Sequence, residues 1–269
     1  MWQSYGDDPW VLADWPLLRR RRLSGFDVRV AVTGDGIAVR LPADGFESVL
    51  IAGAQAESLL GDPEAAGVER VLVMGPVAPG VAARLGEQGL ERRRSWDWYS
   101  IDEEPDVPDA PLAPPGGRVR EGDLEVLDEA DMPEVHTLLM GAYPLADRRS
   151  STNGRWWGVR RAGELVAVGA VDTWRGQDRD GSVDWNSHVR SFAVRRGYQG
   201  EGLGTSAFRR ILAEEWRRTG WVQWSTWTDE PEMKALMRSV GARPVVTVTN
   251  FRPAGEASGR SGYPGAETA

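Results

Sequence analysis

Three glycines in the segment Val194–Thr205 constrain the fold of this chain more than any other feature. The segment follows an apolar, strand-like stretch and leads into a helical pattern. Gly200, Gly202 and Gly204 leave its main chain open to close approach. The N–H groups in the first turn of a helix have no partners within the helix and point outward beside the positive end of the helix dipole. Strand, glycine turn and helix together therefore predict a cradle for a pyrophosphate group.

Two common phosphate cradles do not fit this segment. A nucleotide P-loop requires Gly-Lys-Ser/Thr, and the segment contains no lysine. The dinucleotide fingerprint has a different glycine spacing and lies in a parallel βαβ unit. The flanking hydrophobic patterns instead predict a mixed α/β (α+β) arrangement, in which helices flank a mostly antiparallel sheet. We expect strands at 124–127, 156–161, 165–174, 188–194, 221–227 and 245–251, and helices at 130–141, 203–218 and 231–240.

The residues Gln199, Gly202 and Gly204 fit the pattern Gln/Arg-x-x-Gly-x-Gly, which resembles the acyl-CoA loop of the GCN5-related N-acetyltransferase (GNAT) family. The order of elements across 118–253 is also similar to that fold. The resemblance implies that strand 221–227 diverges from the preceding strand, with acetyl-CoA as the co-substrate. The residues implied in its binding are Phe192, Ala193 and Val194 beside the pantetheine arm, and Gln199, Gly200, Glu201, Gly202, Leu203, Gly204 and Thr205 around the pyrophosphate. A glycine turn that only starts a helix is the structural alternative.

Direct transfer to an amine, which the resemblance implies, needs a base for the ammonium group and a proton for the departing thiolate. His188 lies five residues ahead of Ala193, about where several family members carry a general base. An imidazole titrates near neutral pH, so His188 is the candidate catalytic residue. The alternative is a hydrogen-bonded strand histidine without a chemical role.

The proton donor departs from the family pattern. The usual acid is a Tyr four residues before a Gly-Phe pair, and Met237 stands at that place here, because the pair is Gly241-Ala242. Glu230 replaces the family's Asn near the start of the same helix. Water, Tyr143 or Tyr198 would have to deliver the proton, although Tyr198 beside the loop fits a packing role better.

Tryptophans gather in or beside the expected strands of the C-terminal part, where core packing explains most of them. Trp185, expected in a turn before the strand of His188, is the best tryptophan candidate for a substrate pocket, and Tyr143 is a second substrate candidate. Asp172 or Asp184 could hold a substrate ammonium group, although each also fits a solvated surface acid.

A Pro-rich and acidic stretch at 102–117 predicts an extended linker between an N-terminal part at 1–101 and the acyltransferase domain at 118–253. The tail at 254–269 is rich in Gly, Ser and Ala and is expected to be disordered.

The N-terminal part repeats the spacing of the second half of the acyltransferase domain. Setting Gly89 against Gly241 brings Tyr99 onto Phe251 and Val71 onto Gln223. The stretch 51–61 upstream carries no Gln/Arg-x-x-Gly-x-Gly pattern. We therefore predict a degenerate GNAT-like copy that does not bind CoA, with an unrelated smaller α/β domain as the alternative.

Composition narrows the function further. The 269 residues include no Cys and two His, so disulfides and Cys-ligated metals are excluded and no metal site is expected. No stretch approaches the ~20 apolar residues of a membrane helix, and the N-terminus does not read as a signal peptide, so we expect a cytoplasmic protein without a membrane partner. The net charge of −8 argues against nucleic acid. The expected function is acetyl-CoA-dependent N-acetylation of a small-molecule or peptide amine. A non-catalytic acyl-CoA-binding regulatory or interaction protein is the alternative, and a homodimer is left open.

Overall fold

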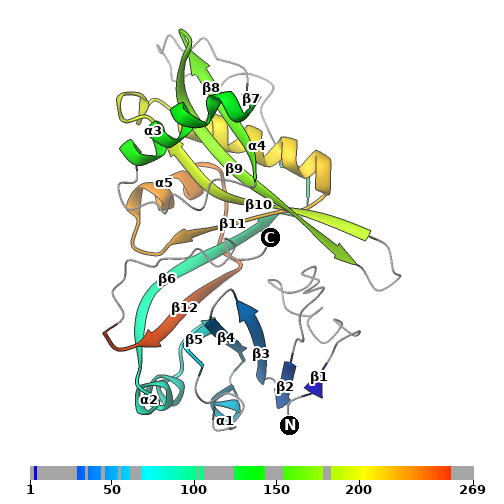
Figure 1. The fold of residues 1–269 in the computed structure, drawn as a ribbon, viewed down its shortest axis with the longest axis vertical. Helices are drawn as coiled ribbons and strands as arrows, with labels where there is room; N and C mark the ends of the chain where they lie inside the picture. Colours follow the sequence, from blue (N-terminus) through cyan, green and yellow to red (C-terminus); the bar gives the residue numbers. More distant parts are fainter. Residues whose placement is uncertain are drawn as a thin grey trace.

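The computed structural model describes residues 3–4, 29–33, 36–43, 46–53, 56–60, 68–101, 103–105, 124–142, 154–177 and 183–255. Within these ranges twelve strands form one sheet in the order β1-β2-β3-β4-β5-β12-β6-β11-β10-β9-β8-β7 (Figure 1). The strands are β1 (Gln3–Ser4), β2 (Arg29–Thr33), β3 (Gly36–Ala43), β4 (Phe46–Ala52), β5 (Arg70–Met74), β6 (Leu90–Ile101), β7 (Leu124–Leu127), β8 (Arg155–Arg161), β9 (Glu164–Gln177), β10 (Val183–Val194), β11 (Val222–Trp227) and β12 (Val246–Pro253). The helices are α1 (Ala56–Leu59), α2 (Pro79–Glu87), α3 (Met132–Ala142), α4 (Leu203–Thr219) and α5 (Pro231–Ser239), with 3-10 turns η2 (Glu129–Asp131) and η4 (Arg196–Tyr198).

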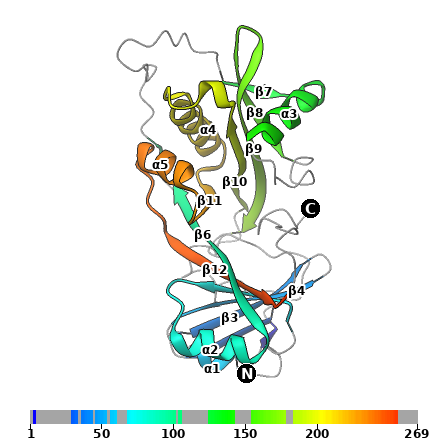
Figure 2. The same cartoon turned by 90° about the vertical axis from the view of Figure 1, so that its left-hand side faces the viewer.

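The C-terminal half of the fold consists of strands β7 to β11 and helices α3 to α5. Helices α4 and α5 cover one face of these strands and α3 covers the other (Figure 2). The predicted helical spacing explains the packing of α4, because Phe208, Ile211 and Leu212 are all buried against the sheet. Helix α4 ends at Thr219, and the left-handed backbone of the following residue, Gly220 (φ +69°), closes the last turn. This half confirms the predicted mixed α/β class, and the expected elements differ from the observed ones mainly at their ends.

Strands β6 and β12 join the two halves by exchange. Strand β6 follows α2 of the N-terminal half, yet it pairs with β11 from Val222↔Ile101 through Trp227↔Trp96. Strand β12 follows α5 of the C-terminal half, yet it pairs with β5 of the N-terminal half. The two exchanged strands also pair with each other and cross between the halves (Figures 1 and 2). The segments on either side of the predicted boundaries at 101 and 118 therefore contribute strands to one sheet. The assignment of these segments as separate domains stays a prediction.

A local two-fold axis relates the halves at this exchange. Helices α2 and α5 both begin with Pro, both have nine residues, and both are followed by a left-handed glycine, Gly89 (φ +76°) and Gly241 (φ +75°). That spacing makes Trp96 equivalent to Val248, and these two residues face each other across β6 and β12. The internal repeat expected from the sequence is thus visible as symmetry in the sheet.

The expected alignment of the repeat needs one correction. Tyr99 and Phe251 are equivalent as expected, and they face Trp224 and Val71 respectively. Val71 is therefore equivalent to Trp224, and not to Gln223. The reason is the turn after the strand, which has four residues (75–78) in the N-terminal half and three (228–230) in the C-terminal half.

Two further expectations about local structure change. Strand β6 begins at Leu90 and not near Trp96, because its first residues pair with the end of β12. Trp185 lies within β10 and not in a turn, because β9 and β10 continue as a long antiparallel pair in which Trp185 faces Arg175.

None of the described helices is long and apolar enough to cross a membrane. Tyr143, nearly all of the expected linker and nearly all of the expected tail lie outside the described residues.

Candidate active site

The glycine turn occupies the predicted place between β10 and α4. Gly200 and Gly202 both have left-handed backbones (φ +81° and +80°), a conformation that favours glycine. Gly204 lies in the first turn of α4, where an added Cβ would come within 3.2 Å of a methyl group of Val194. The first helical hydrogen bond runs from the Ser206 N–H to the Gly202 carbonyl at 3.0 Å. The N–H groups at 203–205 therefore fall outside the helical pattern, as an anion site requires.

Strands β10 and β11 diverge beside this turn. They pair in parallel at Ser187↔Val222, His188↔Gln223 and Val189↔Trp224, and their pairing ends there. Beyond this point β10 continues to Val194 paired with β9, and β11 continues to Trp227 paired with β6. In the described part of the chain no strand pairs with the β11 side of residues 191–194. The main chain of Phe192, Ala193 and Val194 thus has an edge that no described strand pairs with, and its contact with the pantetheine arm stays a prediction.

The N-terminal half has no such opening among its described residues. Strands β4 and β5 stay paired in parallel from Ser48↔Arg70 through Ala52↔Met74, and Met74 is equivalent to Trp227 by the two-fold relation. The helix after β4, α1, has four residues, whereas α4 has 17. The two halves therefore differ at the equivalent place, and a truncated copy that does not bind CoA stays a prediction.

Side chains of the turn tie it to its surroundings. The Gln199 amide donates a hydrogen bond to the Val194 carbonyl at 2.9 Å, which fixes the turn to the end of β10. Glu201 pairs with Arg161 at 3.3 Å, and the hydroxyl groups of Thr205 and Ser239 lie 2.8 Å apart. Leu203 is one of the predicted loop residues, but its side chain is buried in the core and therefore has a structural role.

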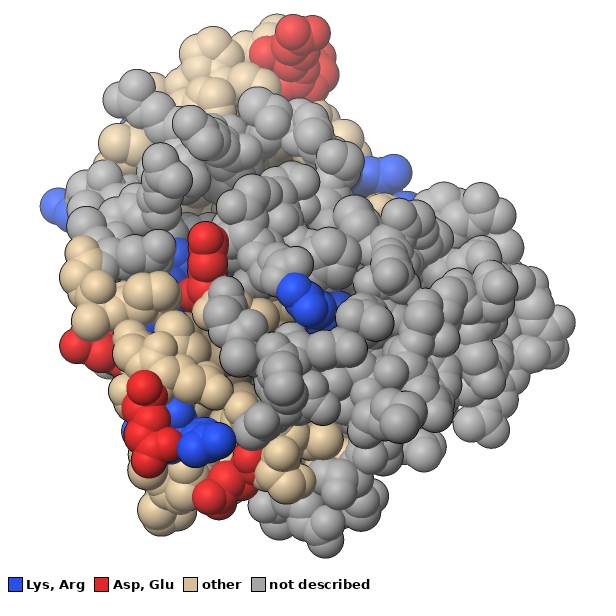
Figure 3. Space-filling model, turned by 60° about the horizontal axis from the view of Figure 1, so that its bottom comes forward, with Lys and Arg blue, Asp and Glu red and all other residues tan. Residues whose placement is uncertain are grey.

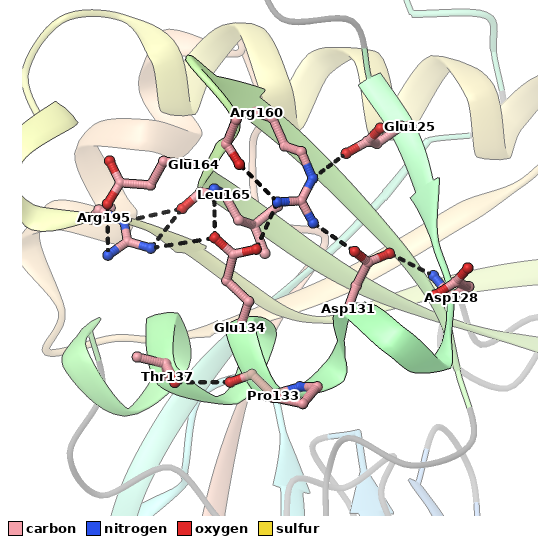
Figure 4. A network of polar contacts seen from close by, with 11 residues as sticks. Glu125, Asp128, Asp131, Pro133, Glu134, Thr137, Arg160, Glu164, Leu165 and Arg195 are labelled. Carbon is pink, nitrogen blue, oxygen red and sulfur yellow. Dashed lines mark hydrogen bonds and ion pairs between the residues drawn. The ribbon is translucent and has the colours of Figure 1, made fainter.

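Arg195, at the start of the turn, belongs to a wider polar network (Figure 4). Its guanidinium donates from Nε and Nη2 to the Leu165 carbonyl at 3.0 and 2.9 Å, and its Nη1 lies 3.2 Å from Glu164. Glu134 of α3 accepts from the Leu165 N–H at 2.8 Å and from Arg160 at 2.6 Å. The backbone hydrogen bond and Arg160 hold the pKa of Glu134 below its usual value. Helix α3, the β8–β9 hairpin and the glycine turn are therefore held as one unit.

His188 lies in the last closed pairs before β10 and β11 diverge, and its side chain is fully buried (0% exposed). Its imidazole stacks on the indole of Trp98 from β6, with ring centroids 5.2 Å apart and planes 7° apart. The Trp98 Nε1–H in turn donates to Gln223 Oε1 at 3.0 Å. The sequence analysis did not identify Trp98 as a neighbour of His188, because the hydrophobic pattern of a sequence does not show which strand lies beside β11.

Asp172 is a partly buried acid paired with an arginine, and not a solvated surface residue. It faces His188 across β9 and β10, and its carboxylate contacts the Arg190 Nε at 2.5 Å. Burial raises the pKa of Asp172 to about 6, while the positive charge of Arg190 acts in the opposite direction. A carboxyl group and an imidazole thus lie on facing residues of neighbouring strands. Asp184 and Trp185 have described backbones only, so their role as substrate contacts stays a prediction.

The expected positions for a proton donor are occupied by structural residues. Met237 is 2% exposed and its sulfur accepts a hydrogen bond from the Trp224 indole at 2.8 Å. The Tyr198 hydroxyl donates to Glu164 at 3.3 Å on the hairpin side of the turn, in agreement with a packing role. Glu230 forms an ion pair with Arg94 at 3.3 Å, and burial raises its pKa.

The tryptophans whose side chains are described in this half are mostly core residues, as expected. Those less than 9% exposed are Trp156, Trp157, Trp221 and Trp224.

Among the described residues no group of three or more His, Cys, Asp or Glu side chains is placed to hold a metal ion. The face in Figure 3 mixes acidic and basic described side chains without a broad field of one sign.

Comparison with known proteins agrees with this geometry. Residues 123–241 match the model of the acetyltransferase (GNAT) family. A GCN5-related N-acetyltransferase from Kribbella flavida has a similar structure, with a TM-score of 0.51, 17% identity, and coverage of 94% of this chain and 97% of that one. An acetyltransferase from the GNAT family of Colwellia psychrerythraea gives a TM-score of 0.51 at 10% identity, covering 84% of each chain. At these identities the structural likeness concerns the fold, and no curated protein matches the sequence.

Proposed function

Because residues 123–241 form a domain of the acetyltransferase (GNAT) family, we propose that this protein transfers an acetyl group from acetyl-CoA to a primary amine. One observation carries the proposal: β10 and β11 diverge directly beside a glycine turn at the N-terminus of α4. The opening offers main-chain groups for an extended thiol arm, and the helix end offers N–H groups for a pyrophosphate. Both features lie within the segment that matches the family.

The residues of the turn fit the two parts of acetyl-CoA. Gly200 and Gly202 have left-handed backbones and no side chains to occupy the space before α4, and Gly204 lets the first turn of α4 pack closely against β10. The free edge of β10 at Phe192–Val194 provides hydrogen-bonding groups for the amides of the pantetheine arm. Acetyl-CoA supplies an activated thioester carbonyl, and a main-chain N–H of this edge polarises it.

His188 is the proposed base. In the reaction the amine nitrogen bonds to the carbonyl carbon, the bond from that carbon to sulfur breaks, and the ammonium proton must leave. His188 is fully buried, so it takes this proton through a water molecule and not by direct contact with bulk solvent. Met237 cannot donate a proton, and Tyr198 is engaged by Glu164, so water or Tyr143 is the proposed proton donor to the thiolate.

The acceptor is proposed to be a small-molecule or peptide amine. Asp172 supports this choice, because a cationic acceptor beside this partly buried carboxylate would favour its ionised form, as Arg190 does. Trp185 and Tyr143 stay candidates for contacts with the acceptor.

A thiol-release assay with acetyl-CoA and a panel of primary amines tests the function. We expect release that depends on one class of amine, and we expect His188→Ala to lower kcat with little change in the Kd of acetyl-CoA. His136→Ala is the matched control, because it removes the other histidine of the chain from the exposed side of α3. Binding of acetyl-CoA without release for any amine would instead support a non-catalytic acyl-CoA-binding protein. Equal kcat in His188→Ala and the wild type would remove His188 as the base.

A further inference from the structure

The N-terminal half contributes a side chain to the candidate active site. Trp98 belongs to β6, which follows α2 of the N-terminal half and enters the sheet beside β11. Its indole is 5% exposed and packs with Leu72 and Val248 in a core that extends into the N-terminal half. The same indole stacks on His188. Trp98 therefore connects the core of one half to the candidate base of the other.

The geometry of this contact spans three neighbouring strands. Trp98 pairs with Ser225 on β11, whereas His188 lies on β10, so the indole reaches across β11 to meet the imidazole. Gln223, which lies between them on β11, accepts the indole N–H at 3.0 Å. This hydrogen bond holds the ring plane of Trp98, and the near-parallel stack then restricts rotation of the imidazole about its side-chain torsions.

We propose that Trp98 is a positioning residue for His188, and that the N-terminal half takes part in catalysis by supplying it through the exchanged strand β6. The inference rests on the proposed function, in which His188 is the base. A stack with planes 7° apart fixes the direction of both ring nitrogens, which lie in the plane of the imidazole. Proton transfer depends on that direction, because a general base must lie within hydrogen-bond reach of the proton that it accepts. Asp172 and Arg190 are the charged groups beside it on the same face.

Three variants of the full chain separate this role from simple core packing. Trp98→Leu removes the aromatic face, and Trp98→Phe keeps an aromatic face without the hydrogen bond to Gln223. Trp96→Leu is the matched control, because Trp96 lies two residues earlier on β6 and is equally buried (3% exposed). The Trp96 ring packs edge-on against Trp227, with ring centroids 5.8 Å apart, on a different part of the sheet from His188.

The first measurement is the NMR signal of the His188 ring protons. The chain has two histidines, so His136→Gln leaves one signal to follow. Stacking on an indole shifts ring protons upfield. We expect that shift in the parent protein and in Trp96→Leu, a smaller one in Trp98→Phe, and none in Trp98→Leu.

The second measurement is the split between kcat and the KM of acetyl-CoA. We expect Trp98→Leu to lower kcat by about 10- to 100-fold, the loss typical of a misplaced catalytic group, while the KM of acetyl-CoA stays unchanged. Trp96→Leu should lose stability and keep its kcat. Equal kcat in the two leucine variants, or an unshifted His188 signal in the parent protein, would overturn the proposal. If no amine supports turnover, the proposed function fails and the positioning of a catalytic base fails with it, while the NMR signal still reports whether the ring contact exists.

Discussion

Replacing Gly202 by Glu gives the sharpest test of the proposed acetyl-CoA site. Gly202 is the residue before α4, with a left-handed backbone (φ +80°, ψ −5°). A glutamate there directs a carboxylate toward the helix N-terminus, where the pyrophosphate is proposed to bind. The left-handed backbone itself costs any residue with a Cβ about 1–2 kcal/mol, so Gly202→Gln is needed to separate strain from charge.

The charge effect follows from Coulomb's law. Two unit charges about 5 Å apart repel by about 3 kcal/mol at an effective dielectric constant of about 20, and by about 0.8 kcal/mol in bulk water. These limits correspond to a loss of about 4- to 300-fold in affinity. We therefore expect Gly202→Glu to bind CoA weaker than Gly202→Gln by a factor within this range. The difference should shrink at high salt, because the site is open to solvent.

Isothermal titration with CoA measures the effect directly. Gly220→Glu is the matched control, because Gly220 is at the other end of α4 with a similar backbone (φ +69°) and open space around it. It should lose stability like the Gly202 variants and keep the wild-type affinity. If Gly202→Glu and Gly220→Glu bind CoA equally well, the pyrophosphate does not lie at the N-terminus of α4, and the assignment of the turn is wrong.

Two further predictions concern the carboxyl groups of Asp172 and Glu215, which both lie beside β10. The pKa of Asp172 is raised from 3.8 to about 6, so its ionisation weakens the fold as the pH rises through that interval, by about 3 kcal/mol in total. Asp172→Asn should remove this loss of stability. Urea unfolding at pH 4 and pH 7 measures the free energy of unfolding of the variant and the wild type. If the difference between the two pH values is the same in both proteins, the prediction is wrong. Glu215 is 0% exposed, accepts hydrogen bonds from Trp157 at 2.8 Å and Ser187 at 2.7 Å, and forms an ion pair with Arg218. Glu215→Gln removes the charge of that pair and should cost about 3 kcal/mol of unfolding free energy. Glu214→Gln, at an exposed neighbouring ion pair, should cost under about 1 kcal/mol in the same urea titration, and equal losses would refute the role of burial.

The sequence by itself determined the local parts of the site. The spacing of Gly200, Gly202 and Gly204 after an apolar stretch placed the turn between a strand and a helix, and the predicted helix at 203–218 differs from α4 by one residue. These features depend on interactions between residues close in the chain, namely the backbone freedom of glycine and the helical spacing of apolar side chains. The repeat around Gly89 and Gly241 was visible for the same reason, because a Pro start and a left-handed glycine end are local signals.

Only the tertiary structure decided which strands lie side by side. Alternation along β6 predicts which side chains share a face, but a strand offers the same main-chain N–H and C=O groups to any neighbour. The pairing of β6 with β11 and of β12 with β5 therefore left no mark in the local pattern. The same limit hid the contact between Trp98 and His188, which are 90 positions apart in the chain and meet across β11. The turn of the candidate site was readable from neighbouring residues, whereas the contact of Trp98 with His188 depends on a choice of strand partner that only the folded sheet makes.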